Sequence, residues 1–149
     1  MQDHTFWENM GNLGVICLAV ILATVVHYAV LRRLNGGVRL IGRYPRFRLL
    51  FGVVMSLIAH SVEIAIFAGA YRISAHSAFG FLEGNFEGSA ADYLYFSYAA
   101  FTTVGFGDIV AHGPMRLLAG MEALTGFVLI TWTASYLFIE MSRTWGTEN

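Results

Sequence analysis

Long apolar stretches alternate with short polar segments along this chain. Three of these stretches come close to or exceed the roughly 20 residues that a helix needs to cross the hydrocarbon core of a bilayer. They are Leu13–Leu31, Leu49–Tyr71 and Leu117–Ile139, and each is almost free of charge. We therefore predict three membrane-spanning helices. No internal repeat and no soluble ligand domain is expected, so the predicted fold class is an all-α membrane protein.

A fourth apolar stretch, Tyr93–Val104, is too short to span the membrane. It is rich in aromatic and small residues, and a glycine-rich segment follows it directly. We predict a helix at 91–102 that enters the membrane and turns back. Non-helical backbone at that depth is tolerated only where it is buried in protein or lines a water-filled path.

The composition supports a membrane protein. Hydrophobic residues make up 56% of the chain and charged residues 13%, about half the charged share of a typical soluble domain. The single cysteine, Cys17, lies inside the first apolar stretch and rules out an intrachain disulfide. We expect no nucleic-acid partner, no organic cofactor and no enzymatic activity.

The distribution of basic residues predicts how the chain is oriented. There is no lysine, and six of the nine arginines fall between the first two predicted spans: Arg32, Arg33, Arg39, Arg43, Arg46 and Arg48. The positive-inside rule places this loop in the cytoplasm. The N-terminus and the segment between Arg72 and Arg116 are then outside, and the C-terminus is inside. We expect a multi-pass protein of the inner (plasma) membrane whose acidic, aromatic start is not a cleaved signal peptide.

The segment from Phe101 to Asp108, with the sequence FTTVGFGD, resembles the selectivity filter of potassium channels. In that family, backbone carbonyls of four such loops replace the hydration shell of the ion. The resemblance implies that K⁺ is the permeant ion and that it is bound by Thr103, Val104, Gly105, Phe106 and Gly107, with Thr102 and Asp108 supporting the filter. Gly105 and Gly107 allow the positive φ angles that turn successive carbonyls to one side. Val104 and Phe106 are expected to pack behind the strand.

The resemblance extends over roughly Leu49–Ile139 and divides the chain into two parts. Residues 1–48 hold the first span and the arginine-rich loop. Residues 49–149 form a pore domain with an outer helix at 49–71, a pore helix at 91–102, the filter at 103–108 and an inner helix at 115–140. The chain looks like a small three-span bacterial member of the ion-channel superfamily.

One pore loop per chain implies that four chains form one pore, so a fourfold symmetric homotetramer in the lipid bilayer is expected. The outer segment carries four acids and no lysine or arginine between Arg72 and Arg116: Glu83, Glu87, Asp92 and Asp108. Repeated four times, these acids would concentrate cations at the mouth. The alternative for Glu83 and Glu87 is that they only solvate a loop.

The first predicted span is free of charge apart from His27, and the other two spans contain His60, Glu63 and Glu122. Ionisable residues at such positions are costly and usually functional. His60 and Glu63 share one helix face, and three interpretations stand: a structural pair bonded across helices, a role in gating or proton sensing, and a metal site that lacks ligands. Glu122 is expected to brace the filter from behind by bonding Ser97, Tyr98 or Thr102. Some related channels carry a carboxylate for this purpose where this chain has Ala99.

The third span contains Gly126, eighteen residues after Asp108. It is predicted to be either a gating hinge or a point of close helix contact. Below it, Ile130, Ala134 and Phe138 are expected to line the pore. Rival functions are a non-selective cation channel, a transporter built around His60, Glu63 and Glu122, and a membrane subunit that does not conduct.

Overall fold

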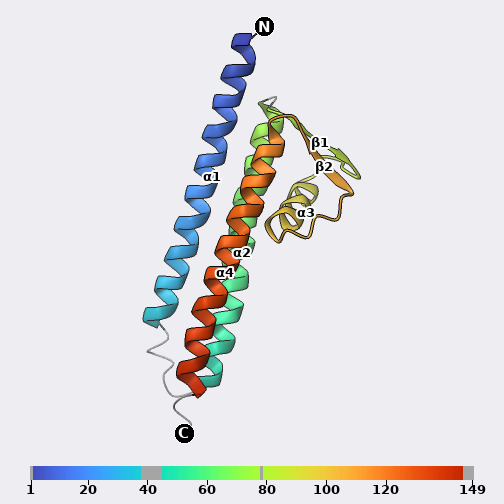
Figure 1. Ribbon diagram of the computed structural model, residues 1–149. Helices are drawn as coiled ribbons and strands as arrows, with labels where there is room; N and C mark the ends of the chain where they lie inside the picture. The colour runs from blue at the N-terminus through green and yellow to red at the C-terminus, as the bar shows by residue number, and fades with distance from the viewer. Residues whose placement is uncertain (1, 38–44, 78, 146–149) are drawn as a thin grey trace.

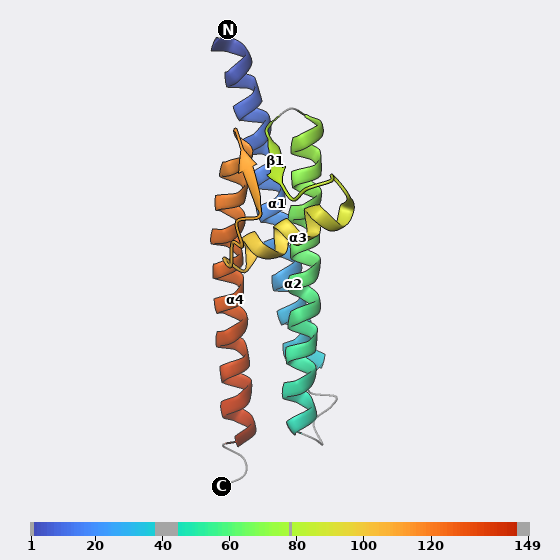
Figure 2. The same cartoon turned by 90° about the vertical axis from the view of Figure 1, so that its right-hand side faces the viewer.

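The computed structural model describes residues 2–37, 45–77 and 79–145. Its elements follow in the order α1 (Gln2–Gly37), α2 (Pro45–His76), β1 (Phe81–Gly84), α3 (Ala90–Phe101), β2 (Ile109–His112) and α4 (Met115–Trp145). The three long helices run side by side, and α3 with the two strands lies against one side of them (Figures 1 and 2). The N-terminus is at the end of the bundle nearer to α3 and the strands, and the C-terminus is at the other end.

All three long helices are able to span a membrane, so the prediction of three spans is confirmed. Their apolar segments are Met10–Asn35, Leu49–His76 and Met115–Arg143, a little longer than the stretches predicted from sequence. α1 has 36 residues and is about 54 Å long at 1.5 Å per residue, which exceeds the roughly 30 Å of the hydrocarbon core. The chain is a multi-pass membrane protein.

α1 packs on the other two long helices through one narrow stripe. The stripe consists of buried residues at spacings of three and four, which fall on one face of a helix: Asn12, Ile16, Ala19, Ala23, His27, Leu31 and Leu34. The alanines bring the helix backbones close together, as small residues do inside membranes. The remaining faces expose large apolar side chains such as Leu18, Ile21 and Val25, as expected of a surface in contact with lipid.

A short antiparallel pairing of β1 with β2 is an addition to the predicted all-α plan. Phe81 pairs with His112 and Gly84 with Ile109. Strands of four residues are too short to show an alternating pattern, which is why the sequence analysis missed them. The two strands flank α3 and residues 102–108 in the sequence, so their pairing joins both ends of this segment. Of the arginines used to predict orientation, Arg39 and Arg43 lie outside the described residues.

α3 begins at a capping box. The Ser89 side chain accepts a hydrogen bond from the Asp92 amide, and the Asp92 carboxylate accepts one from the Ser89 amide. The bond from the Ser89 backbone lowers the pKa of Asp92, since it favours the charged carboxylate. This cap fixes where the helix starts, and the helix ends at Phe101, directly before the glycine-rich loop.

Candidate functional site

The φ angles of residues 103–107 alternate in sign along the chain. The φ angles of Thr103, Gly105 and Gly107 are +59°, +54° and +81°, whereas Val104 and Phe106 do not have positive φ. This alternation is the geometry that turns successive carbonyls of an extended strand to one side. A Cβ on either glycine would meet nothing within 4 Å, so glycine is needed for its backbone conformation rather than for space. Thr103 adopts the left-handed region without being glycine, at a cost of about 1–2 kcal/mol.

The first half of this loop is bonded to the C-terminal end of α3. The Thr103 amide donates to the Ala100 carbonyl at 3.0 Å, and the Gly105 amide donates to the Ala99 carbonyl at 3.2 Å. The Thr102 hydroxyl, predicted to support the filter, donates to the Tyr98 carbonyl at 2.7 Å. Thr102 therefore contacts its own helix rather than the strand.

The second half of the loop is held by Tyr95, a contact that the sequence analysis missed. The Tyr95 hydroxyl donates to Asp108 Oδ2 at 2.9 Å, which raises the pKa of Tyr95. Its ring also stacks on Phe106 at a centroid distance of 6.1 Å. Val104 and Phe106 are 56% and 68% exposed. Phe106 thus packs on α3 through Tyr95, and the expected packing of Val104 and Phe106 behind the strand stays a prediction for the assembled channel.

Glu122 of α4 is fully buried and contacts α3, as expected of a brace behind the loop. Ser97 donates to Glu122 Oε1, and Ser97 is one of the three predicted partners. The other two bond elsewhere: Tyr98 donates to the Ser61 hydroxyl, and Thr102 bonds within α3. The second partner of Glu122 is Tyr71 of α2, whose hydroxyl donates to Oε2 at 2.5 Å. Glu122 thus joins α2, α3 and α4.

Ser97 has a second acceptor within reach, the Ile64 carbonyl at 2.8 Å. A hydroxyl has one proton and donates to one acceptor at a time. The bonds around Glu122 are therefore a connected network, and a change at Glu122 also affects how Ser97 is bonded.

Gly126 of α4 lies against the C-terminal end of α3. A Cβ at this position would overlap the Phe101 carbonyl and lie 2.9 Å from Phe101 Cγ. The geometry therefore favours the close-contact interpretation, and the hinge stays a prediction. Further along α4, the side chains of Ile130, Ala134 and Phe138 lie on an exposed face of the single chain.

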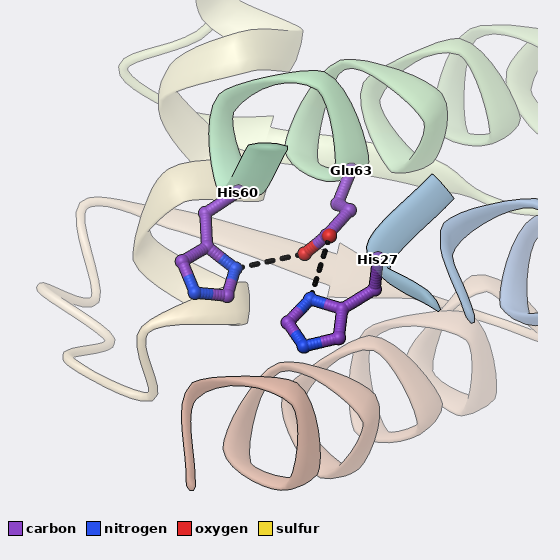
Figure 3. Close-up of side chains that lie close together, drawn as sticks. All are labelled: His27, His60 and Glu63. Carbon is purple, nitrogen blue, oxygen red and sulfur yellow. Dashed lines mark hydrogen bonds and ion pairs between the residues drawn. The ribbon is translucent and has the colours of Figure 1, made fainter. Parts of the chain in front are cut away.

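His60 and Glu63 form a pair that is bonded to other helices, as the structural interpretation of these two residues expected. Both lie on α2, and His60 Nδ1 is 2.8 Å from Glu63 Oε2. The contacts across helices come from other residues. His27 Nδ1 of α1 lies 3.0 Å from Glu63 Oε1, and Thr133 Oγ1 of α4 lies 3.1 Å from His60 Nε2. Figure 3 shows the Glu63 carboxylate between the two imidazole rings.

The residues of the rival transporter hypothesis, His60, Glu63 and Glu122, are divided between two clusters. Glu63 bonds His27 and His60, whereas Glu122 bonds Tyr71 and Ser97. The two carboxylates therefore belong to separate clusters. Sequence patterns alone could not have joined His27 to Glu63, because the two lie 36 residues apart on different helices.

Three of the four acids of the outer segment make different side-chain contacts, and the fourth, Glu87, is exposed. Asp92 caps α3, Glu83 pairs with His112 at 3.0 Å, and Asp108 accepts from Tyr95. All of these groups are at the end of the molecule that carries the loop.

A comparison with protein families matches residues 49–143 to a family described as "Ion channel". The match covers more than half of the chain and includes α3, the loop and nearly all of α2 and α4. No curated protein and no solved structure matches the chain.

Proposed function

The chain belongs to this ion-channel family, and on that premise we propose that it is a subunit of a homotetrameric, potassium-selective channel. The observation that carries the proposal is the alternating backbone of residues 103–107, with positive φ at Thr103, Gly105 and Gly107. Four such strands around one axis supply rings of carbonyl oxygens at fixed spacing. Such rings replace the hydration shell of K⁺ during permeation.

The support for a tetramer is geometric. One strand cannot surround an ion, and each chain has one such loop. The loop of the single chain also leaves Val104 and Phe106 exposed. On α4, Leu124, Phe127 and Ile130 are exposed as well. Neighbouring subunits would cover the two loop residues and part of this helix face.

The orientation follows from the arginines near the first loop. Arg32 and Arg33 are exposed at the C-terminal end of α1, which is the end opposite to the filter loop. With that end in the cytoplasm, the filter opens to the outside of the plasma membrane, and the N-terminus lies on the same outer side. The exposed acids near the loop would then raise the local cation concentration at the outer mouth.

Purified protein in liposomes tests the proposal. A K⁺ gradient is imposed, and efflux is followed with a dye, with protein-free liposomes as the control. We expect K⁺ and Rb⁺ to permeate well above Na⁺, and the protein to have the mass of four chains in mild detergent. Equal permeability of Na⁺ and K⁺ would mean a non-selective channel. Flux coupled to a proton gradient would mean a transporter, and no flux a non-conducting subunit. Each of these three results overturns the proposal.

A further inference from the structure

The cluster of His27, His60 and Glu63 has the composition of a metal site. Sequence considerations offered two ligands on one helix, and the fold adds a third from α1. One ligand atom from each residue can be chosen so that all three atoms lie within 4.8 Å of one another. Two imidazoles and one carboxylate are the donor set that zinc and similar divalent transition metals prefer. We propose that these three residues bind a divalent metal ion of the zinc class.

Two of the distances in the cluster are close to those of a metal site. His27 Nδ1 and His60 Nδ1 lie 3.0 Å and 2.8 Å from the two oxygens of Glu63. In a tetrahedral zinc site the ligand atoms are about 3.3 Å apart, since bonds of roughly 2.0–2.1 Å meet at the tetrahedral angle. The two contacts involve different oxygens, so binding through one oxygen also requires the ligand atoms, now within 4.8 Å of one another, to move closer together. Water would be the fourth ligand.

Burial and charge also favour a cation at this position. Glu63 is 0% exposed and His27 is 1% exposed. Within the described part of the chain, the ion-pair partners of Glu63 are these two histidines, and neither lysine nor arginine is among them. A buried carboxylate is costly unless it is paired or bound to a metal. A divalent cation would compensate its charge directly.

The surroundings of His60 suit a metal-bound histidine. When Nδ1 binds the metal, a neutral imidazole carries its proton on Nε2, and this proton needs an acceptor. Thr133 Oγ1 lies 3.1 Å from His60 Nε2, and a hydroxyl either donates or accepts, so Thr133 suits both tautomers. His27 Nε2 has no hydrogen-bond partner among the described residues, so a water molecule would have to accept its proton.

Trp132 stands between the cluster and a cavity of the bundle. The cavity has a volume of about 340 Å³ and is lined by α1 and α4 near their C-terminal ends, with Trp132 in its wall. The ring of Trp132 packs on His27 at a centroid distance of 5.2 Å. His27, His60 and Glu63 do not line the cavity, so an ion entering from it would have to pass Trp132.

A bound metal would join all four helices. His27 belongs to α1, His60 and Glu63 to α2, and Thr133 to α4. The His60 ring also contacts Phe101, the last residue of α3, at a centroid distance of 5.8 Å. Occupancy of the site would thus fix α1 on the pore domain next to the point where the loop 102–108 begins.

Metal binding by the full chain in detergent tests the proposal directly, without reference to ion flux. The protein is stripped with a chelator and titrated with Zn²⁺, and the bound metal is measured by elemental analysis. Co²⁺ then serves as a probe of geometry, because its tetrahedral complexes absorb visible light far more strongly than its octahedral ones. We expect one ion per chain, a tetrahedral Co²⁺ spectrum and a higher Tm with Zn²⁺.

Glu63→Gln separates metal binding from hydrogen bonding. The amide keeps the size of the carboxylate and can still bond both rings, accepting from one Nδ1 and donating to the other. It is a poor metal ligand, so the affinity of the variant for Zn²⁺ should fall by about tenfold or more. His27→Gln should lose affinity in the same way, and His112→Gln, which changes an exposed histidine outside the cluster, should bind like wild type. Equal Zn²⁺ binding by wild type and Glu63→Gln overturns the proposal, and so does loss of binding in His112→Gln. Because no step measures conduction, the result is independent of potassium selectivity.

Discussion

Gly126→Ala tests whether the inner helix needs this glycine for packing. The added Cβ would lie 2.8 Å from the Phe101 carbonyl carbon, and ordinary contact begins at 3.4 Å. The C-terminal end of α3 and the facing part of α4 must therefore separate by more than about 0.6 Å, because the Phe101 carbonyl oxygen lies nearer still. Since Phe101 directly precedes the loop 102–108, this displacement reaches the filter.

The energetic consequence follows from two opposing effects. Overpacking of this kind costs about 1–3 kcal/mol per chain, and alanine gains about 1 kcal/mol over glycine inside a helix. Gly120→Ala is the matched control, because it lies on the same helix and its Cβ would meet nothing within 4 Å. Gly120→Ala therefore gains helix propensity without the cost of overpacking. The two variants should therefore differ by about 1–3 kcal/mol per chain, with Gly126→Ala the less stable.

Thermal unfolding in detergent measures the difference, and K⁺ efflux from liposomes measures its effect on conduction. We expect a lower Tm and reduced flux for Gly126→Ala, with Gly120→Ala at or above wild type in both. The packing argument is refuted if the two alanine variants have the same Tm and single-channel recordings show a changed open probability for Gly126→Ala. That combination would indicate that Gly126 is a hinge.

Three further substitutions probe the filter and its supports. Glu122→Gln should keep fold, tetramer and selectivity but change open probability, whereas Glu122→Ala should also lower Tm, because the buried Tyr71 hydroxyl loses its acceptor at about 1–3 kcal/mol. A steep fall in single-channel conductance of Glu122→Gln with unchanged gating would place this residue on the ion path instead. Gly105→Ala should abolish flux, since φ is +54° there. A side chain at this left-handed backbone position costs about 1–2 kcal/mol in each of four chains. Normal conduction by this variant would mean that the strand is not a filter. Tyr95→Phe should alter flux by releasing Asp108, and an effect no larger than that of Tyr98→Phe would argue against this support.

Local properties of the chain were predictable from sequence. The length of an apolar stretch decides whether a helix spans the bilayer, and this holds before any packing is known; the three spans follow from it. The positive φ angles of Gly105 and Gly107 were likewise expected from their place in the motif. The pairing of β1 with β2 was not expected, since each strand has only four residues.

Contacts between helices required the tertiary structure. Hydropathy does not specify how far a helix is rotated about its axis or shifted along a neighbour, and these two quantities decide which buried polar groups meet. Glu122 was expected to bond α3, and it does so through Ser97, but its bond to Tyr71 spans 51 residues. His27 seemed only a polar residue in an apolar stretch, and the packing of α1 on α2 places it against Glu63. A helix turns by about 100° per residue, so a rotation of α1 by one residue would separate the two.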